Sequence, residues 1–175
     1  MNLNDGIIRL RALEPADADL LYEWENDPAN WRVSQTLAPY SRFAIEQYVL
    51  NSASNDLYSS RELRLIIECM AGNRPAGILD LFDIDPLNRR AGLGILVAEP
   101  FRKKGYAGRA LRLIIGHCFM HLGWKQIYCN ISAKNVTSLA LFRKQGFTSC
   151  GRKKAWTREG EGWDDEFMLQ RINPD

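Results

Sequence analysis

The chain has 175 residues, of which 46% are hydrophobic and 25% are charged. These values are ordinary for one globular domain and exclude a disordered, collagen-like or coiled-coil chain. The formal net charge is +2, from 23 basic and 21 acidic residues, which argues against a dedicated nucleic-acid-binding protein.

The sequence predicts neither a signal peptide nor a membrane span. Met1 to Leu13 lacks the charged start and apolar run of a signal peptide. No stretch approaches the roughly 18 uncharged apolar residues of a membrane span, so no membrane partner is predicted. Four cysteines form no C-x-x-C pair; they are Cys69, Cys118, Cys129 and Cys150. We expect them to be buried thiols in a reducing, cytoplasmic compartment.

The first sixty residues predict one strand and two helices. Ile7 to Leu13 is a β-prone run, and Pro15 is typical of a first helical residue. The segment 26–28, Asn-Asp-Pro, ends that helix. A second helix is predicted to start at Ser41 and to turn Val49 inward.

An antiparallel meander is predicted next, because three β-prone runs are separated by short turns. The runs are Leu63–Cys69, Ala76–Asp85 and Ala91–Ala98. The longest helix is then predicted from Tyr106 to Leu122, where apolar residues recur at i, i+3, i+4 and i+7.

The last third of the chain predicts a crossover and a hairpin. A strand over Gln126–Ser132 follows the long helix, and a strand–helix–strand crossover makes it parallel to the strand over 91–98. Asn135 is a plausible N-cap for a helix that Gly146 stops. Two further strands are predicted near 147–156 and 166–172, joined by a loop over 158–162. The chain is thus predicted to be an α/β domain with a mixed sheet.

Pro100–Gly108 is the most informative segment, because it joins a strand end to the start of the longest helix. Free N–H groups at a helix start bind anions, and Gly105 allows a positive φ or a close ligand. Arg102, Lys103 and Lys104 add positive charge. The segment is predicted to cradle a pyrophosphate; the alternative is an ordinary basic turn. It matches neither G-x-x-x-x-G-K-S/T nor G-x-G-x-x-G.

Two motifs resemble signatures of the GCN5-related N-acetyltransferase (GNAT) superfamily. The family's R/Q-x-x-G-x-G/A is matched by Arg102-Lys103-Lys104-Gly105-Tyr106-Ala107. Its N-x-x-S/A-x-x-L-Y/F-x-K-x-G-F is matched by Asn135 to Phe147, one predicted strand later. The resemblance covers Ile7 to Ile172. Segments 22–28 and 88–91 resemble the branch with ribosomal-protein and spermidine acetyltransferases.

The resemblance implies one domain over residues 1–175. It implies a mixed, mostly antiparallel sheet with a splayed parallel strand pair, flanked by about four helices. It also implies acetyl-CoA as co-substrate, with pantetheine paired to the backbone of Ile95, Leu96 and Val97. Asn135 would line the pantetheine path and Lys144 would lie near the nucleotide. The pyrophosphate would meet the segment Arg102, Lys103, Lys104, Gly105, Tyr106, Ala107 and Gly108.

The implied reaction is acetyl transfer to a primary amine, which is a polyamine, a protein N-terminus or a small amine. The family's thiolate-protonating tyrosine falls at Phe142, and Ser138 is the nearest replacement. Tyr106 and Tyr128 are weaker candidates. The family's glutamate base falls at Gly92. The possible substitutes are Asp80, Asp83, Asp85 and Glu99.

Two alternative interpretations stay open. Phe142 and Gly92 also allow a non-catalytic acyl-CoA-binding or sensing module. A module that binds another nucleotide cofactor is the weaker alternative. His117 and His121 have metal-ligand spacing but no evident third ligand, so no metal is predicted. Small-molecule or peptide amines are the expected partners, and a homo-oligomer is possible.

Overall fold

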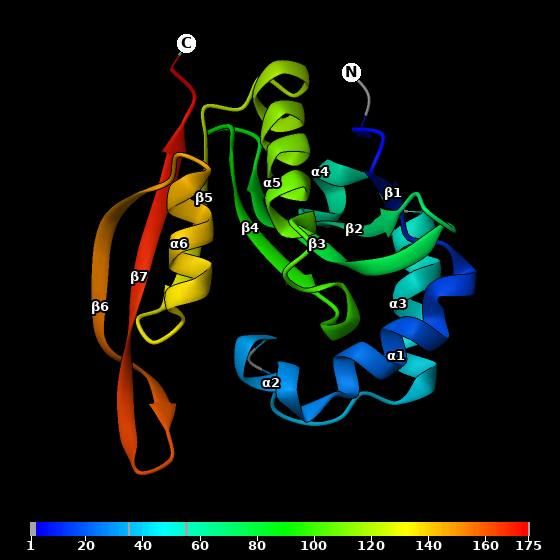
Figure 1. The fold of residues 1–175 in the computed structure, drawn as a ribbon, viewed down its shortest axis with the longest axis horizontal. Helices are drawn as coiled ribbons and strands as arrows, with labels where there is room; N and C mark the ends of the chain where they lie inside the picture. Colours follow the sequence, from blue (N-terminus) through cyan, green and yellow to red (C-terminus); the bar gives the residue numbers. More distant parts are fainter. Residues whose placement is uncertain (1–2, 35, 55, 175) are drawn as a thin grey trace.

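A seven-stranded sheet forms the centre of the computed structural model, which describes residues 3–34, 36–54 and 56–174 (Figure 1). The strand order is β1-β2-β3-β4-β5-β7-β6, and only the β4–β5 pair is parallel. The strands are β1 (Ile8–Ala12), β2 (Leu63–Cys69), β3 (Arg74–Asp85), β4 (Arg90–Val97), β5 (Gln126–Ser132), β6 (Thr148–Glu159) and β7 (Gly162–Ile172). The predicted mixed, mostly antiparallel sheet is confirmed.

Six α-helices flank the sheet within the described residues. They are α1 (Ala18–Asn26), α2 (Pro28–Ser34), α3 (Arg42–Ser54), α4 (Leu57–Ser60), α5 (Tyr106–Gly116) and α6 (Val136–Lys144). Two of them, α2 and α4, were not predicted. Asp27 ends α1 with an extended backbone, but Pro28 then opens α2, because proline fits a first helical turn. Asp56 caps α4 by accepting from the N–H groups of Tyr58 and Ser59.

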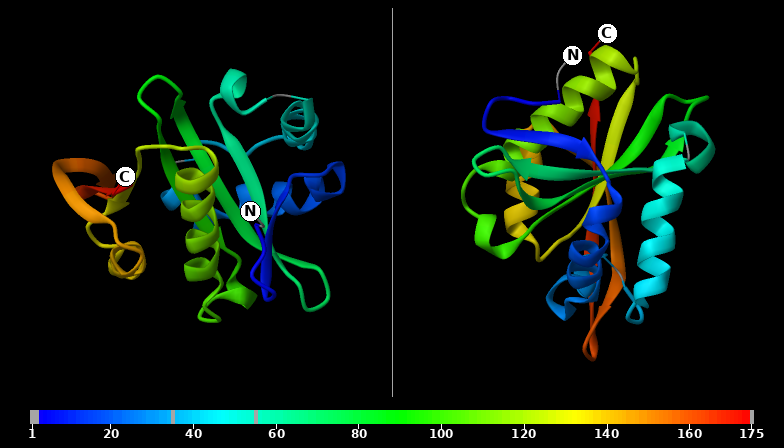
Figure 2. Two further views of the ribbon diagram at one scale, coloured as in Figure 1. Left: turned by 90° about the horizontal axis from the view of Figure 1, so that it is seen from above. Right: turned by 90° about the vertical axis from the view of Figure 1, so that its right-hand side faces the viewer.

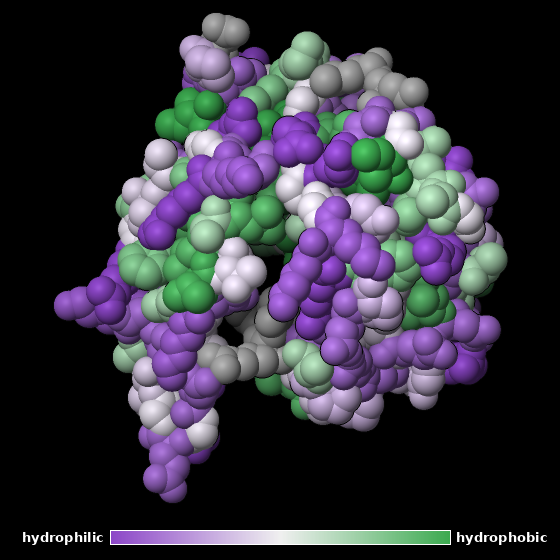
Figure 3. All heavy atoms as spheres, viewed as in Figure 1, coloured by the Kyte–Doolittle hydropathy of each residue, from purple (hydrophilic) through white to green (hydrophobic). Residues whose placement is uncertain are grey.

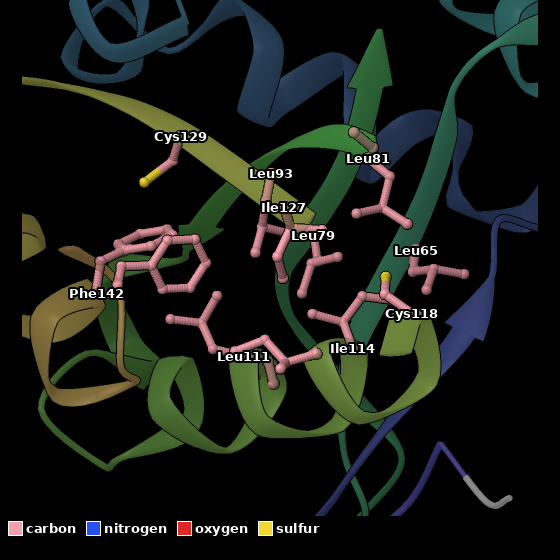
Figure 4. Close-up of a cluster of buried hydrophobic side chains, with 14 of the residues drawn as sticks. Leu65, Leu79, Leu81, Leu93, Leu111, Ile114, Cys118, Ile127, Cys129 and Phe142 are labelled. Atoms are coloured by element: carbon pink, nitrogen blue, oxygen red, sulfur yellow. The ribbon is translucent and has the colours of Figure 1, made fainter. Parts of the chain in front are cut away.

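The helices form a layer on each face of the sheet (Figure 2). Helices α5 and α6 pack on one face, where Leu111, Ile114 and Phe142 meet strand residues such as Leu79 and Ile127 (Figure 4). Helices α1 and α3 pack on the other face through a second apolar cluster. Its buried members are Leu13, Leu21, Ile45, Val49, Ile66 and Ile78. Neighbouring strand residues alternate between the two clusters, as the two-residue period of a strand requires.

The parallel strands β4 and β5 pair over only three residues. The pairs are Arg90 with Gln126, Ala91 with Ile127, and Gly92 with Tyr128. Beyond Gly92 the two strands diverge, and β4 continues to pair with β3 alone as far as Val97. The backbone of residues 93–97 therefore has one edge without a strand partner. The predicted splayed pair is confirmed.

Three further details differ from the sequence predictions or extend them. The loop predicted over 158–162 shrinks to a two-residue turn at 160–161, because β6 and β7 extend into a long hairpin. Cys150 is exposed, whereas the other three cysteines are buried as predicted. Helix α5 ends at Gly116, and the chain continues as a π-helical turn over His117–His121.

No helix in the described part of the chain is long and apolar enough to cross a membrane.

Candidate active site

A cleft of about 1090 Å³ opens where β4 and β5 diverge. Figure 3 shows the hollow between the half that carries α6 and the β6–β7 hairpin and the rest of the molecule. One wall comes from α1, α2, α3 and strands β2 to β4; the other comes from β5, β6, β7 and α6. The cleft therefore lies along the unpaired edge of β4, where a ligand with amide groups can bond the free backbone.

The residues predicted to pair with pantetheine lie on this edge. Ile95 and Leu96 line the cleft. Val97 is the last strand residue and lies beyond the lining, where its carbonyl accepts a hydrogen bond from Arg102 Nε at 3.0 Å. The free edge of β4 thus leads directly into the basic segment before α5.

The basic segment forms an open helix start. Gly105 is the N-cap of α5 with φ +79°, and no side chain of the described residues caps the helix. Lys103 also has a positive φ, +60°, which the sequence did not signal. Arg102, Lys103 and Lys104 are exposed, and a Cβ on Gly105 would meet no atom within 4 Å. The first N–H groups of α5 are thus uncapped by any described side chain and lie beside three cations, which suits an anion.

The start of α5 packs against the end of α6. A Cβ on Gly108 would lie 3.5 Å from Gln145 Nε2 and 3.9 Å from Leu141 Cδ1. Lys144, next to Gln145, is exposed and lies outside the cleft lining. Lys144 is therefore near the helix start that is predicted to hold the pyrophosphate. It lies at the opposite end of α6 from Asn135.

The other end of α6 faces the cleft. Asn135 is the predicted N-cap, since its Oδ1 accepts from the Ser138 N–H at 3.1 Å. Asn135, Ser138 and Phe142 all line the cleft. The Phe142 side chain is 3% exposed and packs edge-on against Phe147. No described group bonds the half-buried Ser138 hydroxyl, so it is free to meet a ligand.

The position of the family's glutamate base is closed by an aromatic ring. A Cβ on Gly92 would lie 2.2 Å from Phe82 Cε2, so the ring of Phe82 occupies the space of a side chain there. Phe82 lines the cleft and packs edge-on against Tyr128, with ring centroids 6.1 Å apart.

The substitute residues suggested by the sequence are scattered. Asp80 lines the cleft, whereas Asp83 and Asp85 line a separate depression of about 500 Å³ and Glu99 lies in a 3₁₀ turn after β4. The Tyr128 hydroxyl donates to Asp83 at 3.2 Å, and burial together with the Asp83 charge raises the pKa of Tyr128. The Tyr106 hydroxyl lies 3.2 Å from Cys69 Sγ. Neither tyrosine lines the cleft.

An arginine on the cleft wall was missed by the sequence reasoning. Arg64 on β2 donates from Nε and Nη2 to the two carboxylate oxygens of Asp80, at 2.7 and 2.9 Å, and from Nη1 to Glu25. Burial opposes its charge, but Asp80 and Glu25 outweigh that effect and raise the pKa of Arg64. Its guanidinium also lies over the Tyr48 ring. The available signal in the sequence was the charged Arg64 inside the mostly apolar strand predicted over 63–69. The structure pairs it in register with Asp80.

The opposite wall also carries an ion pair. Lys153 on β6 donates to Glu166 on β7 at 2.8 Å and to Asn130 Oδ1 at 3.2 Å, and its ammonium lies over the Trp156 ring. Among the five tryptophans, Trp24 and Trp156 line the cleft.

The family follows from comparison with known proteins. A sequence model described as an acetyltransferase (GNAT) domain matches residues 8–148. The chain therefore belongs to the GNAT acetyltransferase family. It is an acetyl-CoA-dependent N-acetyltransferase, an enzyme that moves an acetyl group from acetyl-CoA to an amine.

Several known proteins are similar to this chain in sequence or in fold. The spermidine N(1)-acetyltransferase of Escherichia coli K12 is 26% identical over 141 residues, 81% of this chain and 73% of that one. A crystal structure of spermidine N-acetyltransferase from Vibrio cholerae with CoA and spermine has a TM-score of 0.85, at 21% identity and 96% coverage of both chains. The ribosomal L7/L12 alpha-N-protein acetyltransferase RimL has a TM-score of 0.79, at 23% identity, covering 97% of this chain and 92% of its own.

Proposed function

We propose that residues 1–175 act as one N-acetyltransferase domain that binds acetyl-CoA along the free edge of β4 and transfers its acetyl group to a primary amine in the cleft. One observation carries the proposal: the free edge of β4 over 93–97 ends at the uncapped start of α5. The thioester arm of acetyl-CoA would fit the free edge of β4, and its pyrophosphate would fit the helix start.

The cofactor site follows from this placement. The backbone of Ile95, Leu96 and Val97 would pair with the pantetheine amides, and Asn135 would line their path. Lys144, next to Gln145 at the end of α6, would lie near the nucleotide. The pyrophosphate would be held by the segment Arg102, Lys103, Lys104, Gly105, Tyr106, Ala107 and Gly108.

In the reaction, the cleft holds the amine nitrogen against the thioester carbonyl. A C–N bond forms, the C–S bond breaks, the nitrogen loses a proton and the sulfur gains one. Ser138, one helical turn before Phe142 on the cleft side of α6, would supply the hydroxyl for the sulfur, because Phe142 has none. No carboxylate occupies the position of Gly92, where Phe82 closes the space. The amine attacks in its neutral form, and without a carboxylate at that position its proton would pass to water.

The acceptor class agrees with the relatives. Their names state spermidine and the alpha-amine of a ribosomal protein as acceptors. An amine nitrogen is the chemistry common to both. The cytoplasmic location and the possible homo-oligomer remain predictions.

The test is an amine panel assayed by release of the CoA thiol. We expect transfer to at least one primary amine, at a rate that rises between about pH 6 and 9.5 as the acceptor deprotonates. Acetyl-CoA binding measured by calorimetry, with no transfer to any amine across that range, would instead indicate the non-catalytic sensing module.

Replacing Ser138 by alanine tests the leaving-group role. We expect kcat to fall by about tenfold or more with an unchanged Kd for acetyl-CoA, since general acids typically contribute about 10²- to 10⁴-fold and a CoA thiolate already leaves readily. Thr137→Ala is the matched control, because Thr137 is an exposed hydroxyl on the same helix outside the cleft lining.

The same assay separates two roles of Ser138. A kcat for Ser138→Ala within about twofold of wild type, or roughly 0.4 kcal/mol of barrier, leaves only a packing role for this residue. Phe142→Tyr is expected to be tolerated and to raise kcat if the ring points at the sulfur.

A further inference from the structure

The ring of Phe82 lies against β4 at the point where the two parallel strands part. Phe82 pairs in register with Gly92, and Gly92 with Tyr128 is the last pair of the β4–β5 ladder. A Cβ on Gly92 would lie 2.2 Å from Phe82 Cε2, and a Cβ on Gly94 would lie 3.8 Å from Phe82 Cε1. The ring therefore occupies the space beside Gly92 and extends along the strand to Gly94.

Phe82 and Tyr128 lie between two hollows of the molecule. Phe82 lines the cleft, whereas Tyr128 lines the depression of about 500 Å³. The two rings pack edge-on, with centroids 6.1 Å apart. The Tyr128 hydroxyl donates to Asp83 at 3.2 Å, and this bond holds the tyrosine ring beside Phe82. Open space thus lies behind the aromatic pair, on the side away from the cleft.

The aromatic pair also lies at the end of the path proposed for the CoA arm. With pantetheine along the free edge of β4, running from Val97 toward Leu93, the thioester arrives where the two strands close. An acyl chain cannot continue between the strands there, because Gly92 and Tyr128 are paired. The chain has to turn toward one face of the sheet.

The two faces of the sheet differ at this point. On the face of α5 and α6, Leu93 and Ile127 are at most 2% exposed and belong to the main core (Figure 4). A close-packed core has no space for an added chain. On the other face β4 carries Gly92 and Gly94, and the three atoms nearest to a Cβ on Gly92 all belong to Phe82. An acyl group would therefore turn toward the Phe82 ring.

We propose that Phe82 is a specificity-determining residue for the acyl donor, which admits an acetyl group and rejects longer acyl chains. Beyond the carbonyl carbon, an acetyl group has one carbon and a butyryl group has three. The added carbons need the space of the ring, and moving the ring disturbs its packing against Tyr128. The proposal rests on the proposed function, because it uses the path of pantetheine along β4.

The experiment compares acetyl-CoA, propionyl-CoA and butyryl-CoA with the most reactive amine of the panel. The readout is kcat/KM for each donor at a fixed amine concentration, from release of the CoA thiol. In each case the amine nitrogen bonds to the acyl carbon, the C–S bond breaks and CoA leaves as the thiol. Mass spectrometry of the acylated amine ensures that hydrolysis of the thioester is not counted.

For the wild type, we expect acetyl-CoA to exceed butyryl-CoA by at least about 100-fold, with propionyl-CoA between them. One methylene group changes kcat/KM by about 10- to 200-fold in a close-fitting pocket, and butyryl-CoA has two more than acetyl-CoA.

Two variants of Phe82 should relax this limit in steps. Phe82→Ala opens the cleft toward the depression behind the ring, so the ratio of butyryl-CoA to acetyl-CoA should rise by at least about tenfold. Phe82→Leu removes only the far edge of the ring, so it should admit propionyl-CoA and still reject butyryl-CoA. A general loss of stability lowers kcat/KM for all three donors alike and does not produce this graded response.

Tyr48→Ala is the matched control. Tyr48 is also a half-buried aromatic residue of the cleft wall, but it lies on α3, where the Arg64 guanidinium is 5.3 Å from the centre of its ring. Its loss should leave the ratio of butyryl-CoA to acetyl-CoA within about twofold of wild type.

Each outcome decides the proposal. A wild type that uses butyryl-CoA as well as acetyl-CoA overturns it, as does a ratio that neither Phe82 variant moves or that Tyr48→Ala moves equally. All three results leave the proposed N-acetyltransferase standing. If none of the three donors supports transfer to any amine, the proposed function is wrong and this inference with it. If Phe82→Ala does not fold, the wild-type ratio and Phe82→Leu still decide.

Discussion

Replacing Gly105 by glutamate is expected to abolish measurable acetyl-CoA binding, with Kd raised at least about 100-fold, or 2.7 kcal/mol. Gly105 is the N-cap of α5, and a side chain there points into space that no protein atom within 4 Å of the Cβ occupies. A carboxylate in that space repels a pyrophosphate and competes for the same N–H groups. The measurement is isothermal titration calorimetry with acetyl-CoA and with a pantetheine fragment that lacks phosphate. The fragment should lose less affinity than acetyl-CoA.

Two controls separate charge from backbone strain. Gly105→Ala keeps the strain of a left-handed residue, about 1–2 kcal/mol, and adds no charge, so stability should fall while Kd changes only a few-fold. Gly160→Glu is the control for the added carboxylate. Like Gly105, Gly160 has a positive φ, +58°, and open space around an added Cβ, but it lies at the tip of the β6–β7 hairpin. It should bind acetyl-CoA like the wild type. An unchanged Kd for Gly105→Glu would mean that the pyrophosphate is held elsewhere.

Local signals in the sequence sufficed for most elements and for the helix start at Gly105. Strands β2 and β5 have the predicted bounds, and Asn135 and Gly146 limit α6 as predicted. These features depend on neighbouring residues: alternation, an N-cap and a left-handed glycine. The helix start at Gly105 is of the same kind.

The cleft wall formed by α1, α2, α3 and strands β2 to β4 could not be predicted, because it depends on side chains that meet only in the folded chain. Arg64 and Glu25 are 39 residues apart and lie on different layers. The ring of Phe82 fills the space above Gly92 from the neighbouring strand. The sequence therefore listed Asp80 as a possible base, but could not show that Arg64 engages both of its oxygens.

Gly77 illustrates the same limit and leads to the largest expected loss of stability. Nothing in its sequence context distinguishes it from other strand glycines. In the fold it pairs with Val97, and a Cβ there would lie 2.2 Å from the Leu96 carbonyl oxygen and 3.0 Å from Val97 Cα. Both atoms are backbone, so no side chain can rotate away. We expect Gly77→Ala to lose about 3 kcal/mol or more, which lowers Tm by roughly 6–12 °C for a chain of this size.

The same substitution tests whether β4 carries the cofactor. Relief of the clash has to displace Leu96 and Val97, the backbone proposed to pair with pantetheine, so acetyl-CoA affinity should fall at temperatures where the variant is still folded. Gly94→Ala is the control for stability: it lies on β4, and its Cβ would meet Phe82 at 3.8 Å and Asp80 at 3.9 Å, which are ordinary contacts. Its Tm should stay within about 2 °C of wild type, because glycine in a strand adds little packing. Equal Tm values for the two variants would contradict the close approach of β3 and β4. A low Tm for Gly77→Ala with unchanged Kd would instead place the pantetheine arm away from the free edge of β4.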